Sequence, residues 1–563
     1  MKRLNLIIAA ILLVSQICWS QQNRPNIILI LTDDLDSRSI AHMPNLQALI
    51  ADQGTTFSNY FVSVPLCCPS RASILRGQYA HNTQIFTNRP PNGGFEKFRD
   101  LEHENSTIAT WLQAAGYRTA LFGKYLNGYP DDQPTYIPKG WDEWYCVIDT
   151  HYYDYRINEN GNVVQYGHQP EDYETDVLSR KVTDFIQRHK AAPFFIYLAP
   201  FAPHSPQTPA PRHQNAFPGA KAPRVPSFDE PNVSDKPQWL RNVPPLSNND
   251  IQSIDKRYRE RLQSLLAVDE MIKSIIDTLA ANELANTYIF FTSDNGFHLG
   301  EHRIASGKDT PYDEATHVPL IVRGPNVPQA VALTHFTQNI DLAPTFAELA
   351  GATMPSFIDG RSLAPLLKNN PPPTTTWRQG ALIEHGTNSA NAGIPEFQAL
   401  RTSDYLYVEY KTGEGELYEL RNDPYQLRNR YDTADPTLIA QLAKQLNTLR
   451  QCKGGGCLIT SVDEKDDTGL PSRFELMQNY PNPFGRLPFI SSTTIRFALS
   501  AREHVTLKIF DLNGRELKTL VDGKLAAGEH NVNLNAANLP NGVYFYQIKT
   551  ESFSQTRKAV LRR

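Results

Sequence analysis

The sequence has little of three features, each of which would point to a particular class of protein. It has only six cysteines in 563 residues, too few for a scaffold held together by disulfides. It has no excess of positive charge, because 55 Lys and Arg stand against 59 Asp and Glu, a formal net charge of −4. This balance argues against a protein held on nucleic acid by general electrostatics. After the amino terminus, no apolar run is long enough to predict a transmembrane segment.

The amino terminus has the pattern of a secretory signal peptide. Lys2 and Arg3 precede an apolar run over residues 4–14, and residues 18–20 resemble the small-residue site that a signal peptidase cuts. A buried N-terminal helix is the alternative, but the abrupt polar break at Gln21 fits it less well. We therefore expect a signal peptide at residues 1–20. The mature protein would be exported, and would be secreted or held at the cell surface.

Most of the remaining chain has the pattern of an α/β body. Four short apolar runs alternate with helical patterns, which predicts a mostly parallel sheet flanked by helices on both faces. The runs cover residues 26–31, 117–122, 194–198 and 288–291, and two of the helical patterns cover residues 107–115 and 256–279. The runs lead into Asp33-Asp34, Lys124, His204 and Asp294-Asn295, respectively. Because ligands bind outside the carboxyl ends of strands in such sheets, these side chains should converge on one site.

Two smaller parts follow this body. Aromatic strands and turns at residues 381–431 predict a small antiparallel sheet, followed by a helix at residues 436–450. Alternating strands near the C-terminus predict a β-sandwich. The expected organisation is a main domain at 21–370, a C-terminal α+β subdomain at 371–460, a linker at 461–472 and a β-sandwich at 473–563.

The densest group of reactive side chains lies at residues 67–77, which read Cys-Cys-Pro-Ser-Arg-Ala-Ser-Ile-Leu-Arg-Gly. Taken alone, Cys67 at a helix start beside Arg71 fits either a thiolate or a buried cysteine pair beside a capping serine. The whole string resembles the sulfatase signature, Cys-x-Pro-Ser-Arg followed by Leu-x-Gly. The likeness to sulfatases extends from Asn26 to about Leu349. It implies an alkaline-phosphatase-like fold for the main domain.

The resemblance also implies a modified nucleophile. In sulfatases the first cysteine of the signature, here Cys67, is oxidised to formylglycine by a formylglycine-generating or sulfatase-maturing enzyme. The hydrated aldehyde has one hydroxyl to attack sulfur and a second whose deprotonation expels sulfate. A serine has no such second hydroxyl. The implied activity is that of a sulfuric ester hydrolase, a sulfatase.

A divalent cation is implied beside this nucleophile. The family's metal ligands correspond to Asp33, Asp34, Cys67, Asp294 and Asn295. The four Asp and Asn residues are hard oxygen donors that suit Ca²⁺ or, as second choice, Mg²⁺. Taken singly, each pair also fits a turn or a helix cap. Their occurrence together after two strands favours metal binding.

Four further side chains match family positions that handle charge and protons. Arg71 and Lys124 would balance negative charge at the nucleophile, and Lys308 would contact the sulfate. His204 lies where the family has a histidine near the scissile oxygen. It is the first choice as the general acid, with Lys308 as the alternative.

One position departs from the pattern of many sulfatases. Leu126 stands where they have a histidine in Gly-Lys-x-His, so the base expected there is absent or replaced, with His81 and His298 as candidates. This variant, Gly-Lys-Tyr-Leu-Asn, resembles the glucosamine-6-sulfatases. The resemblance implies a 6-O-sulfate on N-acetylglucosamine or a related sugar as the substrate, within a sulfated glycan or oligosaccharide.

Other functions stay open at this point. The substrate could be a marine algal polysaccharide such as ulvan or carrageenan. Within the same superfold, the activity could be that of a phosphoester or phosphonate hydrolase, and a non-catalytic glycan-binding protein is a further alternative. Glu384, His385 and Arg401 of the subdomain either form a wall of the substrate pocket or simply pack.

The C-terminal region carries two more signals. Cys452 and Cys457 enclose a short glycine-rich turn and are expected to form a disulfide, while Cys68 and Cys146 stay unassigned. The last ninety or so residues resemble the sorting domains of type IX secretion, on the Tyr-Pro-Asn-Pro-Phe motif at 480–484 and the basic end at 562–563. A carbohydrate-binding sandwich is the alternative. The type IX secretion machinery is therefore an expected partner.

Overall fold

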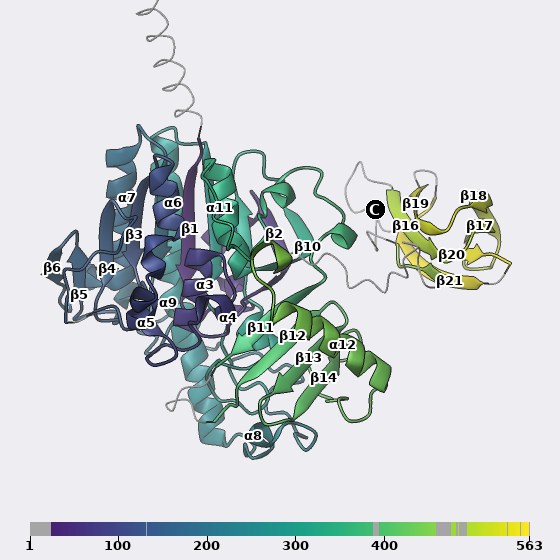
Figure 1. The fold of residues 1–563 in the computed structure, drawn as a ribbon, viewed down its shortest axis with the longest axis horizontal. Helices are drawn as coiled ribbons and strands as arrows, with labels where there is room; N and C mark the ends of the chain where they lie inside the picture. Colours follow the sequence, from purple (N-terminus) through teal and green to yellow (C-terminus); the bar gives the residue numbers. More distant parts are fainter. Residues whose placement is uncertain are drawn as a thin grey trace, which may run out of the picture. The chain divides into compact units, whose positions relative to one another are not determined.

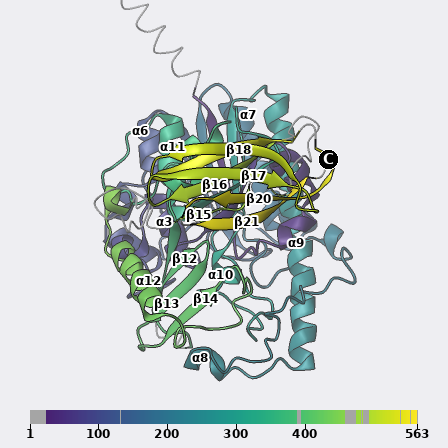
Figure 2. The same cartoon turned by 90° about the vertical axis from the view of Figure 1, so that its right-hand side faces the viewer.

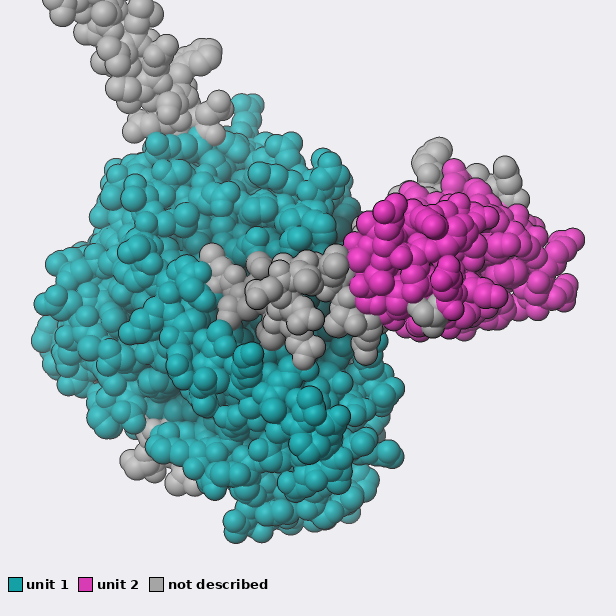
Figure 3. Space-filling model, turned by 45° about the vertical axis from the view of Figure 1, so that its right-hand side comes forward, with its two compact units in different colours: residues 1–461 teal, residues 462–563 magenta. Residues whose placement is uncertain are grey.

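The computed structural model describes residues 24–130, 132–386, 393–457, 474–479, 482, 492–536, 539–551 and 553–561. The expected signal peptide and linker lie outside these residues. The chain divides into two compact units, residues 1–461 and 462–563, which Figure 3 colours separately. Within the described ranges, no helix has the length and apolar character needed to cross a membrane.

Unit 1 is built on a ten-stranded sheet with the strand order β10-β2-β9-β8-β1-β7-β3-β4-β5-β6. The four predicted strands lie side by side at its centre: β8, β1, β7 and β3 pair in parallel. Every residue of β1 is buried, as expected for a strand covered on both faces. The prediction of a mostly parallel α/β sheet is therefore confirmed. The strands are β1 Asn26–Thr32, β2 Thr55–Phe61, β3 Arg118–Gly123, β4 Glu143–Val147, β5 Arg156–Glu159, β6 Asn162–Gln165, β7 Phe194–Ala199, β8 Thr287–Ser293, β9 Leu320–Arg323 and β10 Val331–Gln338.

Helices cover both faces of this sheet, as Figures 1 and 2 show from two sides. Successive residues of β1 point to opposite faces. Ile27 and Leu29 join an apolar cluster with α3, α6 and α11, whereas Ile28 and Ile30 join a second cluster with α2, α7 and α9. The helices of unit 1 are α2 Pro44–Leu46, α3 Cys67–Arg76, α4 Ala80–Thr83, α5 Gly94–Asp100, α6 Ile108–Ala114, α7 Glu174–His189, α8 Gln238–Arg241, α9 Asn248–Ala281, α10 Asp313–Thr316, α11 Leu342–Ala350 and α12 Pro436–Leu449.

The long helix α9 begins earlier than the sequence pattern predicts. The apolar periodicity starts near residue 256, but the helix starts at Asn248. Ser247 and Asp250 form a capping box there, each side chain accepting a hydrogen bond from the other residue's backbone N–H. The first turn is exposed and polar, so periodicity alone misses it.

The C-terminal part of unit 1 is a four-stranded antiparallel sheet in the order β11-β12-β13-β14. Helix α12 packs on it, with Leu442 and Leu446 in one apolar cluster with Leu400 of β12. Cys452 and Cys457 form a disulfide after the helix. The predicted small sheet, helix and disulfide are confirmed. The strands are β11 Gly380–His385, β12 Phe397–Thr402, β13 Tyr405–Tyr410 and β14 Gly415–Glu419.

Unit 2 consists of two antiparallel sheets, β15-β16-β19 and β18-β17-β20-β21. Apolar residues of both sheets, such as Phe497 and Ile509, form one core. The structure therefore has the expected β-sandwich, with β15 and β21 as strands that the sequence pattern did not reveal. The bounds are β15 Glu475–Leu476, β16 Ser492–Leu499, β17 Glu503–Phe510, β18 Glu516–Leu525, β19 Gly528–Asn535, β20 Gly542–Lys549 and β21 Ser554–Leu561.

Candidate active site

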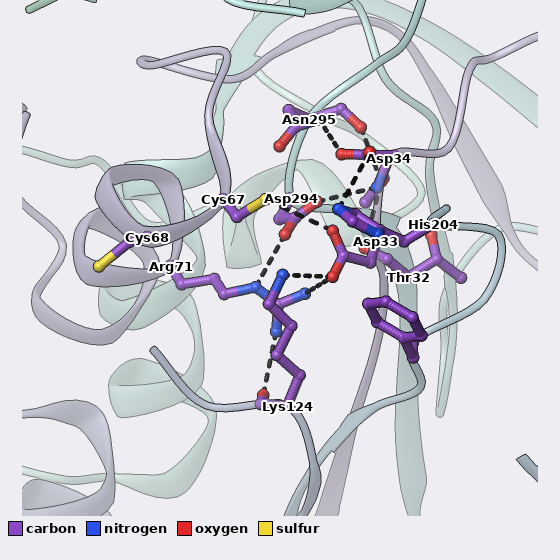
Figure 4. A network of polar contacts seen from close by, with 12 residues as sticks. Thr32, Asp33, Asp34, Cys67, Cys68, Arg71, Lys124, His204, Asp294 and Asn295 are labelled. Atoms are coloured by element: carbon purple, nitrogen blue, oxygen red, sulfur yellow. Dashed lines mark hydrogen bonds and ion pairs between the residues drawn. The ribbon is translucent and has the colours of Figure 1, made fainter. Parts of the chain in front are cut away.

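Polar side chains that follow the central strands meet at the carboxyl ends of these strands. Residues from α3 and from the loop after β8 join them there. We call this group the Cys67 cluster, and most of it is drawn in Figure 4. Hydrogen bonds and ion pairs connect its members. The convergence expected from the strand order thus occurs in the structure. The cluster consists of Asp33, Asp34, Cys67, Arg71, Lys124, His204, Asp294, Asn295 and Lys308.

Cys67 is the first residue of α3, directly after the extended Leu66. Its Sγ lies 3.5 Å from Asp33 Oδ1 and 2.7 Å from Lys308 Nζ. Arg71 is four residues further along and so lies on the same face of the helix. Cys68 points away from the cluster (Figure 4). The helix therefore presents residue 67, rather than residue 68, to the positive side chains.

Two backbone features fix the loops that carry the oxygen donors. Asp34 has a φ of 66°, in the left-handed region that Asp tolerates better than most residues. Gly296 follows Asn295, and a Cβ at this position would lie 2.1 Å from the Glu314 carbonyl oxygen. Any larger residue would displace the Asp294-Asn295 turn, which explains the glycine there.

Each Arg or Lys of the cluster contacts a buried carboxylate. Arg71 Nε donates to Asp294 Oδ2 at 2.8 Å, and Arg71 is fully buried. Lys124 Nζ donates to Asp33, and Lys308 Nζ donates to Asp34. Buried charges are stable only when paired in this way. The three carboxylates and three cations balance, so an added divalent cation and an added sulfate ester can enter without a large excess of either sign.

These contacts shift the protonation equilibria of the cluster. Burial raises the pKa of the Asp33 carboxyl, but the cations around it, led by Lys124, outweigh burial and hold the pKa below its usual value. Asp34 is lowered in the same way, chiefly by Lys308. Burial and the negative charge of Asp33 raise the pKa of the Cys67 thiol to about 12. As a cysteine, residue 67 is thus a protonated thiol.

The donor set of the cluster fits a hard divalent cation. One ligand atom from each of Asp33, Asp34, Cys67 and His204 lies within 4.8 Å of the others. Asn295 donates from Nδ2 to Asp34 Oδ1 at 2.7 Å, and its own Oδ1 is buried without a hydrogen-bond partner. Buried amide oxygens normally have a partner, and a cation would supply one. Carboxylate and amide oxygens are ligands that Ca²⁺ prefers.

His204 is more exposed than Asp33, Asp34 and Cys67, with 29% of its side chain exposed. Its Nδ1 lies 2.8 Å from the Ser205 carbonyl oxygen, to which it donates. Its Nε2 lies 3.6 Å from Asp34 Oδ2. Because Nδ1 is engaged by the backbone, Nε2 is the nitrogen that faces the cluster.

The rings of the two histidines considered as replacements for the one missing at Leu126 bond to other groups. Leu126 is buried in the apolar core. His81 hydrogen-bonds Glu384 and the Cys452 carbonyl oxygen, and His298 hydrogen-bonds Thr310 Oγ1. Within the described part of the chain, no hydrogen bond or ion pair joins either ring to the cluster.

Sequence reasoning missed Arg261 of α9. This fully buried guanidinium donates to the Asp34 carbonyl oxygen, to the Pro203 carbonyl oxygen at 3.3 Å and to Asp36 Oδ2 at 3.3 Å. It thus connects the loop that carries Asp34 to the loop that carries His204. A signal was present, since Arg261 is a charged residue on the apolar stripe of a predicted helix.

These features define an α/β protein of alkaline-phosphatase-like fold whose candidate nucleophile lies at a helix N-terminus, among buried cations and metal-type oxygen donors. The chain belongs to the sulfatase family, because the Sulfatase domain matches residues 25–352. The C-terminal domain of N-sulphoglucosamine sulphohydrolase matches residues 300–452, and the secretion system C-terminal sorting domain matches residues 478–562. The assignments as a sulfuric ester hydrolase and as a carrier of a type IX sorting domain are confirmed.

Within the sulfatase family, the chain is similar to proteins whose activity is named. Human N-acetylglucosamine-6-sulfatase is 35% identical over 482 residues, which cover 78% of this chain and 87% of the human protein. A protein solved in complex with its substrate D-glucosamine-2-N,6-O-disulfate has a TM-score of 0.65 at 26% identity, covering 75% of this chain and 97% of that one. A phosphonate monoester hydrolase of Agrobacterium radiobacter shares the fold, with a TM-score of 0.61 at 20% identity over 76% and 95% of the chains. The resemblance to N-acetylglucosamine-6-sulfatases is confirmed.

Proposed function

We propose that this chain is an exported sulfatase that removes 6-O-sulfate from N-acetylglucosamine or a related sugar on glycans or polysaccharide-derived oligosaccharides. The observation that carries the proposal is the Cys67 cluster, in which the residue at the start of α3 lies beside Lys308 Nζ and Asp33. Positive charge around a nucleophile is what a sulfate ester requires.

Two groups are needed besides the side chains. Asp33, Asp34, Asp294 and Asn295, with residue 67, would hold Ca²⁺, which would neutralise negative charge beside the nucleophile. Formylglycine at position 67, made by a maturing enzyme, would supply as its hydrate the hydroxyl that attacks sulfur and a second hydroxyl that allows sulfate to leave. Both proposals are supported by the donor chemistry of the cluster and by family membership.

The remaining residues of the cluster bind the ester and move one proton. Lys124 and Lys308 would neutralise the sulfate oxygens, and Arg71, which contacts Asp294 at 2.8 Å, would hold that carboxylate in position. A sugar hydroxyl is a poor leaving group, so its oxygen must be protonated as the S–O bond breaks. His204 is our first choice for this step, since its exposed ring presents Nε2 to the cluster. Lys308 is the alternative acid.

The modification and the role of residue 67 can be tested together. We expect mass spectrometry of the peptide that contains residue 67 to find formylglycine after co-expression with a maturing enzyme. Cys67→Ala should abolish turnover of sulfated N-acetylglucosamine without loss of folding. A residue that stays cysteine in an active preparation would refute the proposed nucleophile.

The choice of ester needs a separate assay, because a phosphonate monoester hydrolase shares the fold. We expect kcat/KM for sugar sulfates to exceed that for phosphate and phosphonate monoesters. A strong preference for phosphorus esters would refute the sulfatase assignment for this chain. Sulfated ulvan and carrageenan oligosaccharides belong in the same panel, because they would identify an algal rather than a hexosamine substrate.

Export is the second part of the proposal. The sorting domain at residues 478–562 supports passage through a type IX secretion system, and the signal sequence expected at residues 1–20 would direct the chain to the periplasm first. Deleting residues 473–563 should leave the enzyme in the periplasm. Secretion of the truncated chain at the level of the full chain would contradict this role.

A further inference from the structure

His204 lies on a short turn, residues 201–207, that follows β7 and belongs to neither a helix nor a strand. Two backbone hydrogen bonds close the turn from within. The His204 N–H donates to the Phe201 carbonyl oxygen at 2.9 Å, and the Gln207 N–H donates to the His204 carbonyl oxygen at 3.0 Å. The position of the His204 ring relative to the Cys67 cluster therefore depends on contacts that reach the turn from other elements.

Two side chains from other elements hold the carbonyl oxygens at this ring. Arg261 donates to the Pro203 carbonyl oxygen at 3.3 Å, and the Tyr152 hydroxyl donates to the His204 carbonyl oxygen at 2.7 Å. The two donors differ in what else they hold. Arg261 also donates to the Asp34 carbonyl oxygen, so replacing it disturbs a loop of proposed metal ligands as well. The Tyr152 hydroxyl acts on the histidine's own residue.

The ring of Tyr152 reaches the histidine by a second route. Tyr152 is buried, and its ring lies 5.2 Å from the Phe201 ring, which in turn lies 4.7 Å from the His204 ring. Tyr152 also stacks on Tyr173 at 5.7 Å. Packed aromatic rings leave little room for movement. Tyr152 therefore fixes both the backbone of His204, through its hydroxyl, and the ring of His204, through Phe201.

The position of this ring matters because of the step proposed for it. A general acid must lie within hydrogen-bond reach of the atom that it protonates. His204 Nε2 would give its proton to the ester oxygen as the S–O bond breaks and the sulfuryl group passes to residue 67. The sugar then leaves as the neutral alcohol, and the ring regains a proton from water. A displacement of about 1 Å can cost such a step as much as 100-fold in rate.

We propose that Tyr152 is a positioning residue for the general acid, because its hydroxyl and ring hold the turn that presents His204 to the leaving oxygen. The proposal rests on the sulfatase function proposed above, in which His204 protonates the sugar oxygen. Tyr152 transfers no proton and contacts no substrate atom in this role. Its removal should therefore slow the proton transfer and leave substrate binding and the attack on sulfur unaffected.

The first test compares two esters that differ in their need for a proton. Tyr152→Phe should lower kcat for N-acetylglucosamine-6-sulfate about tenfold with KM unchanged, because proton transfer contributes only in the transition state. Turnover of 4-nitrophenyl sulfate should change by less than about twofold, since nitrophenolate leaves without protonation. The Tm should be retained, because the His204 carbonyl oxygen keeps the hydrogen bond from Gln207. An equal loss on both esters, or no loss on the sugar, would refute the proposal.

Tyr155→Phe is the matched control for the lost hydroxyl. Tyr155 is also buried, and its hydroxyl donates at 2.9 Å to a backbone carbonyl oxygen, that of Asp172, which lies outside the turn. This variant should keep the kcat of the unchanged protein on both esters. A selective loss on the sugar in Tyr155→Phe as large as that in Tyr152→Phe would show that the effect is not specific to the His204 turn.

A second variant tests the route through the rings. Phe201→Leu keeps an apolar side chain but removes the ring that packs on His204, so it should also slow the sugar ester more than 4-nitrophenyl sulfate. Phe185→Leu is its control, because Phe185 is buried and packs at 4.5 Å on another histidine, His189 of α7. If Phe201→Leu and Phe185→Leu give the same ratio of sugar to aryl turnover, the ring contact does not position the acid.

His204→Ala separates this proposal from the function on which it rests. It should slow the sugar ester far more than 4-nitrophenyl sulfate, and adding Tyr152→Phe to it should cost nothing further. Selective loss in His204→Ala without selective loss in Tyr152→Phe refutes the role of Tyr152 alone. Equal loss on both esters in His204→Ala means that His204 is not the acid, which refutes both roles. If the formylglycine-containing protein hydrolyses neither ester nor any other sulfate, the proposed function itself is wrong.

Discussion

Replacing Arg261 with methionine should destabilise unit 1 and impair the Cys67 cluster at the same time. The guanidinium is fully buried and donates to the carbonyl oxygens of Asp34 and Pro203 and to the Asp36 carboxylate. It also lies 4.5 Å from the centre of the Phe297 ring. Methionine keeps an apolar stem of similar length but leaves all three acceptors without this donor.

The expected loss of unfolding free energy follows from the three groups to which Arg261 donates. Removing one side of a buried ion pair costs about 3–5 kcal/mol, because the other charge stays buried. The carbonyl oxygens of Asp34 and Pro203 each lose a hydrogen bond from a charged donor, worth about 1.5–3 kcal/mol. The loss of the ion pair and of these two hydrogen bonds is not additive, because all three come from one guanidinium and because water can replace part of the lost hydrogen bonding. We expect Arg261→Met to lower the free energy of unfolding by about 4 kcal/mol. Arg261→Lys keeps the charge but loses the planar donor fork, so its loss should be about half as large.

Urea denaturation of unit 1 in the full chain, followed by tryptophan fluorescence, measures the loss. The control is Arg257→Met on the same helix, because Arg257 is partly exposed and donates only to the Ala305 carbonyl oxygen at 2.9 Å among the hydrogen bonds of the described residues. It should cost about 1 kcal/mol or less. Since Arg261 joins the loops of Asp34 and His204, kcat/KM should also fall, by about 10- to 100-fold. If Arg261→Met loses no more stability than Arg257→Met, the reasoning is refuted.

Three further predictions concern conditions and distant contacts. Chelation of divalent cations should abolish turnover and lower the Tm, because the buried carboxylates of the Cys67 cluster lose the cation that they bind. Ca²⁺ should restore both turnover and Tm better than Mg²⁺. A Tm that does not change when chelator is added would contradict the metal site. Burial raises the pKa of Glu174 from 4.5 to about 8. Between these two pH values the carboxyl is protonated in the folded state and ionised in the unfolded state. Stability should therefore fall as pH rises from about 5 to 8, and Glu174→Gln should remove about 3–4 kcal/mol of that fall, as urea midpoints at the two pH values would show. Removing the Cys452–Cys457 disulfide by alanine at both positions should cost about 2 kcal/mol by the loop-entropy relation, seen as a lower Tm; an unchanged Tm would show that the bridge is dispensable.

The central sheet was predictable because its strands are covered on both faces. The runs at β1 and β7 are continuous and apolar, and each leads into a polar residue of the site, Asp33 or His204. Because neighbouring parallel strands run in the same direction, residues that follow their carboxyl ends lie at the same end of the sheet. The spacing within α3 added the relation between Cys67 and Arg71, since four residues make about one helical turn.

Contacts between distant elements were not predictable in the same way. Arg401 was expected either to form part of a pocket wall or simply to pack, and the structure pairs it with Asp313 of α10. Nothing in the local pattern of β12 specifies this partner, which depends on how the small sheet packs on the body. Leu126 shows the same limit: its burial in the core explains the residue type, but not which group performs the task of the missing histidine.

The charge arrangement of the Cys67 cluster determines which substitutions can be interpreted. Asp33 and Asp294 each neutralise a buried cation, Lys124 and Arg71 respectively. Removing either carboxylate leaves that cation uncompensated, so a loss of turnover in such a variant would combine lost metal binding with lost stability. Cys67 differs, because its thiol is held protonated and its removal changes no charge. Cys67→Ala therefore leaves the charge pairs of the cluster in place, so lost turnover with retained Tm reports on residue 67 itself, as nucleophile and as proposed metal ligand.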